Sequence, residues 1–91
     1  MTDPMTVKLN WREREALSWL LKAERFDRKL GYAPTPRYPY SFPSGVGAGT
    51  LDGLAEKGLL VCVRRDVSGC GCYSLGHTGT ARAEAEEAHG T

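Results

Sequence analysis

Three cysteines and a histidine lie close enough in the sequence to raise the question of a metal site. Cys70 and Cys72 precede His77, and Cys62 stands eight residues before Cys70. Zinc needs four ligands that converge tetrahedrally, and structural sites use wider cysteine pairs in turns. Cys70 and Cys72 would share one face of an expected strand and Cys62 the other, so we expect no metal site. A Cys70 to Cys72 disulfide would need an awkwardly short ring, which leaves reduced thiols as the expectation.

Catalytic motifs give no support for an enzyme. The stretch GVGAGT, residues 45–50, is rich in glycine but lacks the lysine of a phosphate-binding loop. A nucleophile elbow and a dinucleotide fingerprint are absent. His77 and His89 have no carboxylate and nucleophile at motif spacing. We therefore expect neither catalysis nor a cofactor.

Arg64 and Arg65 flank the tip of an expected hairpin, where guanidinium groups could bind phosphate. Adjacent strand residues point to opposite faces, so one of the two would face a given duplex. The alternative is that both charges only solvate the hairpin and discourage edge-to-edge pairing. Other basic residues that could extend a phosphate-binding surface are Lys57, Arg37, Arg12 and Arg14. Exposed helix charges usually only solvate a helix, and that is the alternative for each of these.

Charge is distributed unevenly along the 91 residues, although the formal net charge is only +1. Residues 1–66 carry 11 Lys and Arg against 8 Asp and Glu, whereas residues 67–91 carry one basic residue against three glutamates. A polyanion would have to meet the first two thirds of the chain. No apolar run approaches the roughly 18 residues that cross a membrane, and the opening residues do not form a secretory signal. We expect one cytoplasmic domain over residues 10–91, preceded by a tail at residues 1–9.

The positioning elements begin with a helix over residues 11–30. Asn10 can cap this helix, Glu13 can complete a capping box, and Gly31 can end it. Apolar residues recur at steps of three and four and predict one broad core face. Its members are Ala16, Leu17, Trp19, Leu20, Leu21, Ala23, Phe26 and Leu30.

Residues 32–44, YAPTPRYPYSFPS, differ from the expected helix in being rich in proline and aromatic residues. Four prolines remove amide donors and favour an extended or polyproline-like connector. Some of the aromatic rings in this segment are expected to pack across the helices. The alternative is an exposed aromatic recognition strip, formed by Tyr38, Tyr40 and Phe42.

A second helix is expected to begin between Ser44 and Thr50 and to end near Lys57, with Gly58 in the left-handed position after it. Residues 60–75 then predict a hairpin with its tip at residues 66–69. The expected pairs are Arg65 with Cys70, Val63 with Cys72, Cys62 with Tyr73 and Leu60 with Leu75. The face carrying Leu60, Cys62, Tyr73 and Leu75 is assigned to the core. A short alanine-rich helix over residues 77–89 completes an α+β domain.

This order of helix, connector, helix, hairpin and helix resembles a winged helix-turn-helix domain. TLDGLAEKGLLVCVRR, residues 50–65, resembles the end of a recognition helix and the first wing strand of MarR-type and PadR-type regulators. YSLGHTGTARAEA, residues 73–85, resembles their second wing strand and following helix. The second helix of that fold is missing, because the proline-aromatic connector occupies its place. Glycine and alanine also fill the positions that would face the major groove, where hydrogen-bonding side chains read bases.

The resemblance implies a small transcriptional regulator that binds double-stranded DNA. Its contacts would come from Arg64, Arg65, Lys57, Thr50 and Arg37, mainly through phosphate. Dimerisation is common in those families, which is the ground for expecting a homodimer. The alternative function is a winged-helix scaffold for protein contact, an adaptor or an inhibitor of a cellular or host protein, of bacterial or phage origin. That alternative would use Tyr38, Tyr40 and Phe42.

Overall fold

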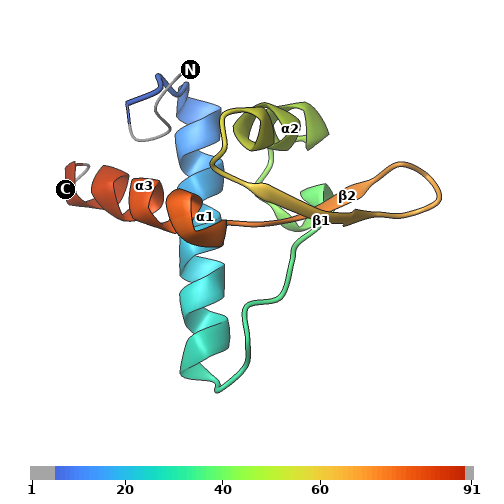
Figure 1. Cartoon of the computed structure of the whole chain (residues 1–91), viewed down its shortest axis with the longest axis horizontal. Helices are drawn as coiled ribbons and strands as arrows, with labels where there is room; N and C mark the ends of the chain where they lie inside the picture. Colours follow the sequence, from blue (N-terminus) through green and yellow to red (C-terminus); the bar gives the residue numbers. More distant parts are fainter. Residues whose placement is uncertain (1–5, 90–91) are drawn as a thin grey trace.

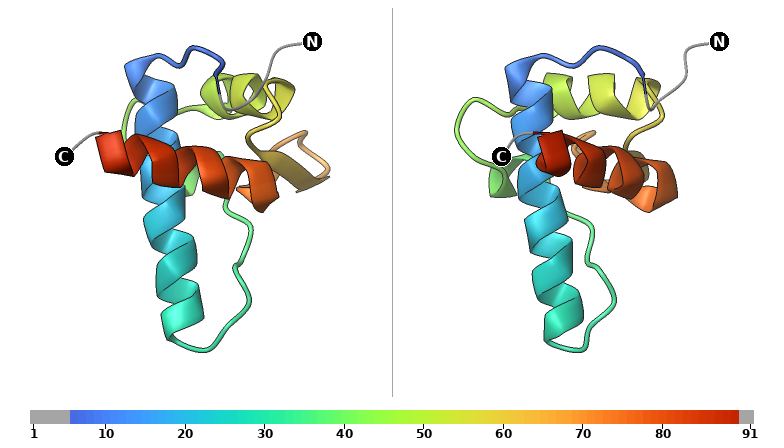
Figure 2. Two further views of the ribbon diagram at one scale, coloured as in Figure 1. Left: turned by 60° about the vertical axis from the view of Figure 1, so that its left-hand side comes forward. Right: turned by 90° about the vertical axis from the view of Figure 1, so that its left-hand side faces the viewer.

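Three helices and a two-stranded antiparallel hairpin form a small α+β domain (Figure 1). The computed structural model describes residues 6–89, so residues 1–5 of the expected tail lie outside it. The elements in chain order are α1 (Trp11–Lys29), the 3-10 helix η1 (Pro39–Ser41), α2 (Ala48–Glu56), β1 (Val61–Arg65), β2 (Gly71–Ser74) and α3 (Gly76–His89). Helix α3 crosses α1 near its middle, and the hairpin projects away from the helices (Figures 1 and 2).

The first helix begins where the sequence predicts. The Asn10 side chain accepts a hydrogen bond from the Glu13 amide at 2.9 Å, and the Glu13 carboxylate accepts one from the Asn10 amide at 2.9 Å. These two bonds satisfy two amides that a helix start otherwise leaves without partners. Gly31 adopts a φ of 87° directly after the helix, a backbone conformation that favours glycine. The capping box and the stop are both confirmed.

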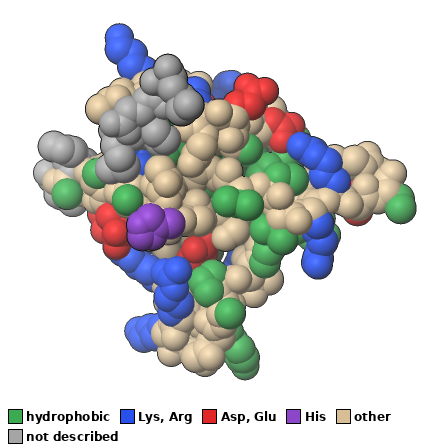
Figure 3. Space-filling view, viewed as in Figure 1, with side chains coloured by type: hydrophobic (Ala, Val, Ile, Leu, Met, Phe, Trp, Pro, Cys, Tyr) green, Lys and Arg blue, Asp and Glu red, His purple; other side chains and the backbone are tan. Residues whose placement is uncertain are grey.

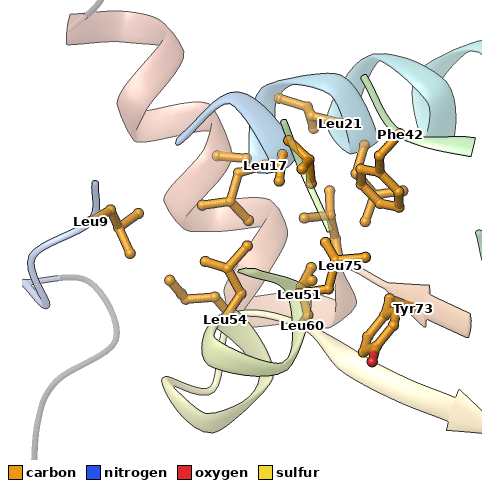
Figure 4. Packing of buried hydrophobic residues seen from close by; sticks show 14 residues of the cluster. Leu9, Leu17, Leu21, Phe42, Leu51, Leu54, Leu60, Tyr73 and Leu75 are labelled. Carbon is orange, nitrogen blue, oxygen red and sulfur yellow. The ribbon is translucent and has the colours of Figure 1, made fainter. Parts of the chain in front are cut away.

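Leucines of α1 and α2 and those that flank the two strands meet in a single core, together with Ala83 of α3 (Figure 4). Leu17 and Leu20 of α1 pack with Leu51 and Leu54 of α2, and Leu75 follows β2. Burying each such side chain contributes about 1.5–3 kcal/mol relative to leaving it in water. The fully buried ring of Tyr73 lies at the edge of the cluster, with its hydroxyl directed away from the leucines (Figure 4). The core therefore fixes the hairpin against both α1 and α2.

The buried face of α1 differs from the predicted one near its C-terminal end. Phe26 is 59% exposed and Leu30 is 55% exposed, so their assignment to the core was wrong. The buried residues there are Glu24 and Asp27. Glu24 accepts a hydrogen bond from the Leu75 amide at 2.9 Å, and Asp27 accepts one from an amide of the connector at 3.0 Å. These carboxylates can be buried because they accept hydrogen bonds from backbone amides, whereas Phe26 and Leu30 stay exposed because no element within residues 6–89 covers them.

The connector is extended up to a short 3-10 turn, and it joins the hairpin. Arg37 and Tyr73 exchange backbone hydrogen bonds of 2.9 and 2.8 Å, which makes residue 37 a one-residue third strand beside β2. Phe42 is buried, and its ring lies 4.6 Å from that of Trp19. Phe42 thus packs into the core, as expected for some of the aromatic rings of this segment, and it does not belong to an exposed strip.

Helix α2 begins at Ala48 with Gly47 as its N-cap, so Ser44 does not cap it. It ends at Glu56, and Gly58 adopts the predicted left-handed conformation with a φ of 80°. Val46, which precedes the helix, is buried as expected for the inner side. Thr50 is only half-buried.

The hairpin has a bulge that the sequence did not reveal. Cys62 pairs with Tyr73 as predicted, but Arg64 lies opposite Cys72 and Arg65 opposite Gly71. The predicted pairs Val63 with Cys72 and Arg65 with Cys70 were therefore wrong. An extra residue in one strand shifts the register of everything beyond it, which exchanges the faces of the two arginines.

Candidate interaction surface around the hairpin

Helix α2 offers little that could read a base edge. Its N-terminal positions Gly47, Ala48 and Gly49 are exposed and carry no hydrogen-bonding side chain. Its polar residues on the outer side are Asp52 and Glu56, which are acidic and would face phosphate with the wrong sign. Apart from the hydroxyl of the half-buried Thr50, the helix that should enter a major groove therefore has neither side-chain donors for a base edge nor positive charge.

Lys57, expected to bind phosphate, is tied to α1. Its ammonium group lies 2.6 Å from a carboxylate oxygen of Glu13 and 3.4 Å from the carbonyl oxygen of Lys8. Glu13 is buried and also completes the helix cap. One carboxylate thus holds the start of α1 and the end of α2 together, and Lys57 supplies the compensating charge.

Arg37 is likewise engaged within the chain. Its guanidinium donates to both carboxylate oxygens of Asp27 at 2.9 Å. The pKa of Asp27 is lowered, first by the hydrogen bond from the Thr35 amide and then by Arg37. Together with the backbone bonds to Tyr73, this ion pair holds the connector between α1 and β2. The structure gives Arg37 a positioning role.

Asp52 links α2 to the hairpin. It accepts a hydrogen bond from the Tyr73 hydroxyl and another from Arg65 at 3.1 Å. The Tyr73 hydrogen bond is the main cause that lowers the pKa of Asp52, with Arg65 second. Burial, followed by the bond to Asp52, raises the pKa of Tyr73 to about 12. Asp52 stands 13 positions before Arg65 and 21 positions before Tyr73, so no local pattern in the sequence points to this cluster.

Arg64 differs from the other basic residues of this region. It makes no ion pair with a carboxylate within residues 6–89. Its guanidinium lies beside the hydroxyl of Tyr38, which is the main cause that raises the pKa of Arg64. The ring of Tyr38 stacks on that of Tyr40, with centroids 5.3 Å apart and planes 5° from parallel. Tyr40 is 79% exposed. We call Tyr38, Tyr40 and Arg64 the Tyr-Arg cluster.

The unit formed by α2 and the hairpin has no net charge. Residues 47–75 carry three basic side chains, Lys57, Arg64 and Arg65, against three acidic ones, Asp52, Glu56 and Asp66. Asp66 is fixed in the turn, where it accepts from the Ser68 and Cys70 amides at 2.9 and 3.0 Å. The three positive and three negative charges of this unit therefore cancel, and ion pairing within the unit does not change that sum.

The remaining sequence candidates lie apart from this surface. Arg12 lies over the ring of Trp11 at 5.4 Å, and Arg14 donates to the carbonyl of Leu9 at 3.2 Å. The three cysteines are reduced, and no group of three or more metal-binding side chains comes together within residues 6–89. In that same part of the chain no helix is long and apolar enough to span a bilayer.

Comparison with known proteins gives no match to a family model, to a curated protein or to a solved structure. The functional argument therefore rests on the geometry of this chain alone. That geometry brings together one of the expected phosphate-binding residues, Arg64, and two residues of the expected aromatic strip, Tyr38 and Tyr40.

Proposed function

We propose that the chain is a protein-interaction module built on a winged-helix scaffold. The layout supports the scaffold: α1, a connector, α2, an antiparallel hairpin and α3 follow one another in the order that the sequence resemblance implies. The connector also adds Arg37 beside β2, so the base of the hairpin is widened and held from both sides. A scaffold of this kind presents the hairpin and the connector as one rigid surface.

The Tyr-Arg cluster is the observation that carries the proposal. Tyrosine and arginine are the side chains most enriched, with tryptophan, at the energetic centres of protein interfaces. A tyrosine ring offers a large contact area and loses little conformational entropy on binding. Here the ring of Tyr38 is already held by stacking on Tyr40, so part of the entropy cost of ordering it is met before a partner binds.

The cluster specifies the chemistry of its partner. Arg64 has no carboxylate within the described chain, so a partner carboxylate can form the bidentate pair that a guanidinium favours. The exposed ring of Tyr40 can contact an apolar or aromatic side chain next to that carboxylate. A protein segment with an acidic residue beside a flat apolar one would fit.

Affinity capture with the double variant Tyr38→Ala, Tyr40→Ala tests this proposal. We expect the variant to lose the partner that the wild type recovers, and Arg64→Ala to weaken recovery. Trp11→Ala is a matched control, because Trp11 is an exposed aromatic residue outside the cluster. Recovery of the same partner by the double variant and the wild type would remove the cluster from the mechanism.

A second candidate function is DNA binding, favoured by the projection of the hairpin away from the helices (Figure 1). Arg64 and Arg65 near its tip could reach phosphate. The ion pair of Arg65 with Asp52 is exposed, so phosphate could compete for Arg65. Removing Arg65 from Asp52 leaves an uncompensated carboxylate next to the DNA, however, and this is why we rank the DNA function second.

A further inference from the structure

Three large apolar side chains stay exposed at the C-terminal end of α1 and the start of the connector. Phe26 is 59%, Leu30 55% and Tyr32 67% exposed. Phe26 and Leu30 are four residues apart and so lie on one face of the helix. We call these three residues the α1 stripe. It belongs to the opposite end of the connector from the Tyr-Arg cluster and is independent of the proposed function.

The stripe stands on a rigid support. The lower half of α1 extends clear of the other helices, with only the connector beside it (Figures 1 and 2). On the core side of this half, Asp27 accepts from the Thr35 amide at 3.0 Å and from Arg37 at 2.9 Å, which ties the connector to the helix. The Tyr32 amide also donates to the carbonyl of Asp27 at 2.9 Å. The stripe is therefore exposed on a helix end that the connector holds in place.

Positive charge borders the stripe. Lys22 and Lys29 are exposed and lie four residues before and three residues after Phe26, so both neighbour it on the helix surface. Neither lysine makes an ion pair within residues 6–89, although Lys22 lies near enough to Glu87 of α3 to lower the pKa of that carboxyl after Arg25. At the lower end of the molecule, Lys and Arg side chains lie next to hydrophobic ones (Figure 3). The acidic residues of this half, Glu24 and Asp27, are buried on the core side.

A second copy of the chain is a poor occupant for this surface. In an antiparallel pair of α1 helices centred midway between Phe26 and Leu30, Lys29 would lie only about 3 Å along the axis from Lys29 of the other copy. In a parallel pair each lysine would lie opposite itself. Like charges meet in both arrangements, which is unfavourable. The acidic helix α3 is already committed to α1, because Glu87 pairs with Arg25 at 2.9 Å.

We infer that the α1 stripe docks an acidic amphipathic helix of another protein. Apolar side chains of that helix would cover Phe26, Leu30 and Tyr32, and its flanking carboxylates would pair with Lys22 and Lys29. Helix packing through ridges of residues four apart suits a stripe with this spacing. The pairs with the lysines would lie at the rim, so they would add salt dependence and selectivity for an acidic partner.

Two synthetic helical peptides test this inference by titration calorimetry. Both carry leucines at helical spacing, flanked by glutamate in one peptide and by lysine in the other. We expect the acidic peptide to bind at least about tenfold more tightly, and Phe26→Ser, Leu30→Ser to weaken it by about tenfold or more. Lys22→Gln, Lys29→Gln should weaken it about two- to fivefold and flatten its salt dependence.

Val67→Ser is the matched control, since Val67 is an exposed apolar residue on the hairpin. It should leave binding unchanged. Circular dichroism of each variant verifies the fold, and all replaced side chains are at the surface. Equal binding of the two peptides would overturn the inference. So would a dimer in sedimentation equilibrium that Phe26→Ser, Leu30→Ser dissociates, because the occupant would then be a second copy.

Discussion

The salt dependence of DNA binding separates the two candidate functions. Each phosphate that a protein cation neutralises contributes about −0.9 to the slope of log K against log salt. If Arg64 alone is available, the slope is about −0.9, and a rise from about 50 to 200 mM salt weakens binding about 3.5-fold. If Lys57, Arg64 and Arg65 all contact phosphate, the slope is about −2.7 and the same rise weakens binding about 40-fold. Because Lys57 is paired with Glu13 and Arg65 with Asp52, we expect the shallow slope.

Fluorescence anisotropy with a labelled random duplex at several salt concentrations measures this slope. Arg64→Ala should abolish the weak DNA binding that Arg64 alone provides. Arg65→Ala should leave the slope of log K against log salt unchanged. Asp52→Asn is the sharpest perturbation, because it removes the carboxylate that pairs with Arg65 at 3.1 Å. The freed arginine should steepen the slope by about 0.9. A wild-type slope of −2.7 or steeper would refute the pairing argument and make DNA binding the leading function.

Four further predictions concern stability. In Gly79→Ala the added Cβ would lie 1.9 Å from the carbonyl oxygen of Leu59, so the variant should lose about 3 kcal/mol and on the order of 12–24 °C in Tm. Gly49→Ala in α2 meets nothing within 4 Å and should gain up to about 1 kcal/mol; equal Tm values for the two variants would contradict the packing. Because the fold favours the neutral form of Tyr73, its stabilisation should be complete below pH 10 and be lost as the pH rises to about 12; urea unfolding of Tyr73→Phe should lack this alkaline loss. Glu24→Ala leaves the buried Leu75 amide without its acceptor and should cost about 1–3 kcal/mol in chemical unfolding, most of it recovered by Glu24→Gln; an unchanged midpoint would show that water replaces the carboxylate.

Local signals in the sequence predicted local structure well. The capping box of Asn10 and Glu13 and the left-handed glycine after α2 depend on residues within three or four positions, and both are confirmed. The α+β class and the pairing of Cys62 with Tyr73 followed from periodicity and from the position of the turn. Such features are predictable because the interactions that create them lie within one element or one hairpin.

Features that depend on distant partners were not predictable. Helical spacing assigned Phe26 and Leu30 to the core, but a residue is buried only if another element reaches it, and a 19-residue helix is about 28 Å long. Glu24 was not assigned to the core, although the Leu75 amide, 51 positions away, needs it there. The bulge near Val63 leaves no local composition signal, yet it decides which arginine faces α2.

Folding also removes the charge gradient on which a DNA-binding function depended. The acidic C-terminal third does not stay apart from the basic remainder, because Glu84 and Glu87 of α3 come to Arg25 of α1. At Arg64 and Lys29, which make no ion pair within residues 6–89, positive charge lies beside exposed aromatic and apolar side chains. A cation next to an apolar surface suits an acidic, partly apolar protein segment better than a uniform row of phosphates. The same physical argument therefore supports both proposed contact surfaces, and each can fail without the other.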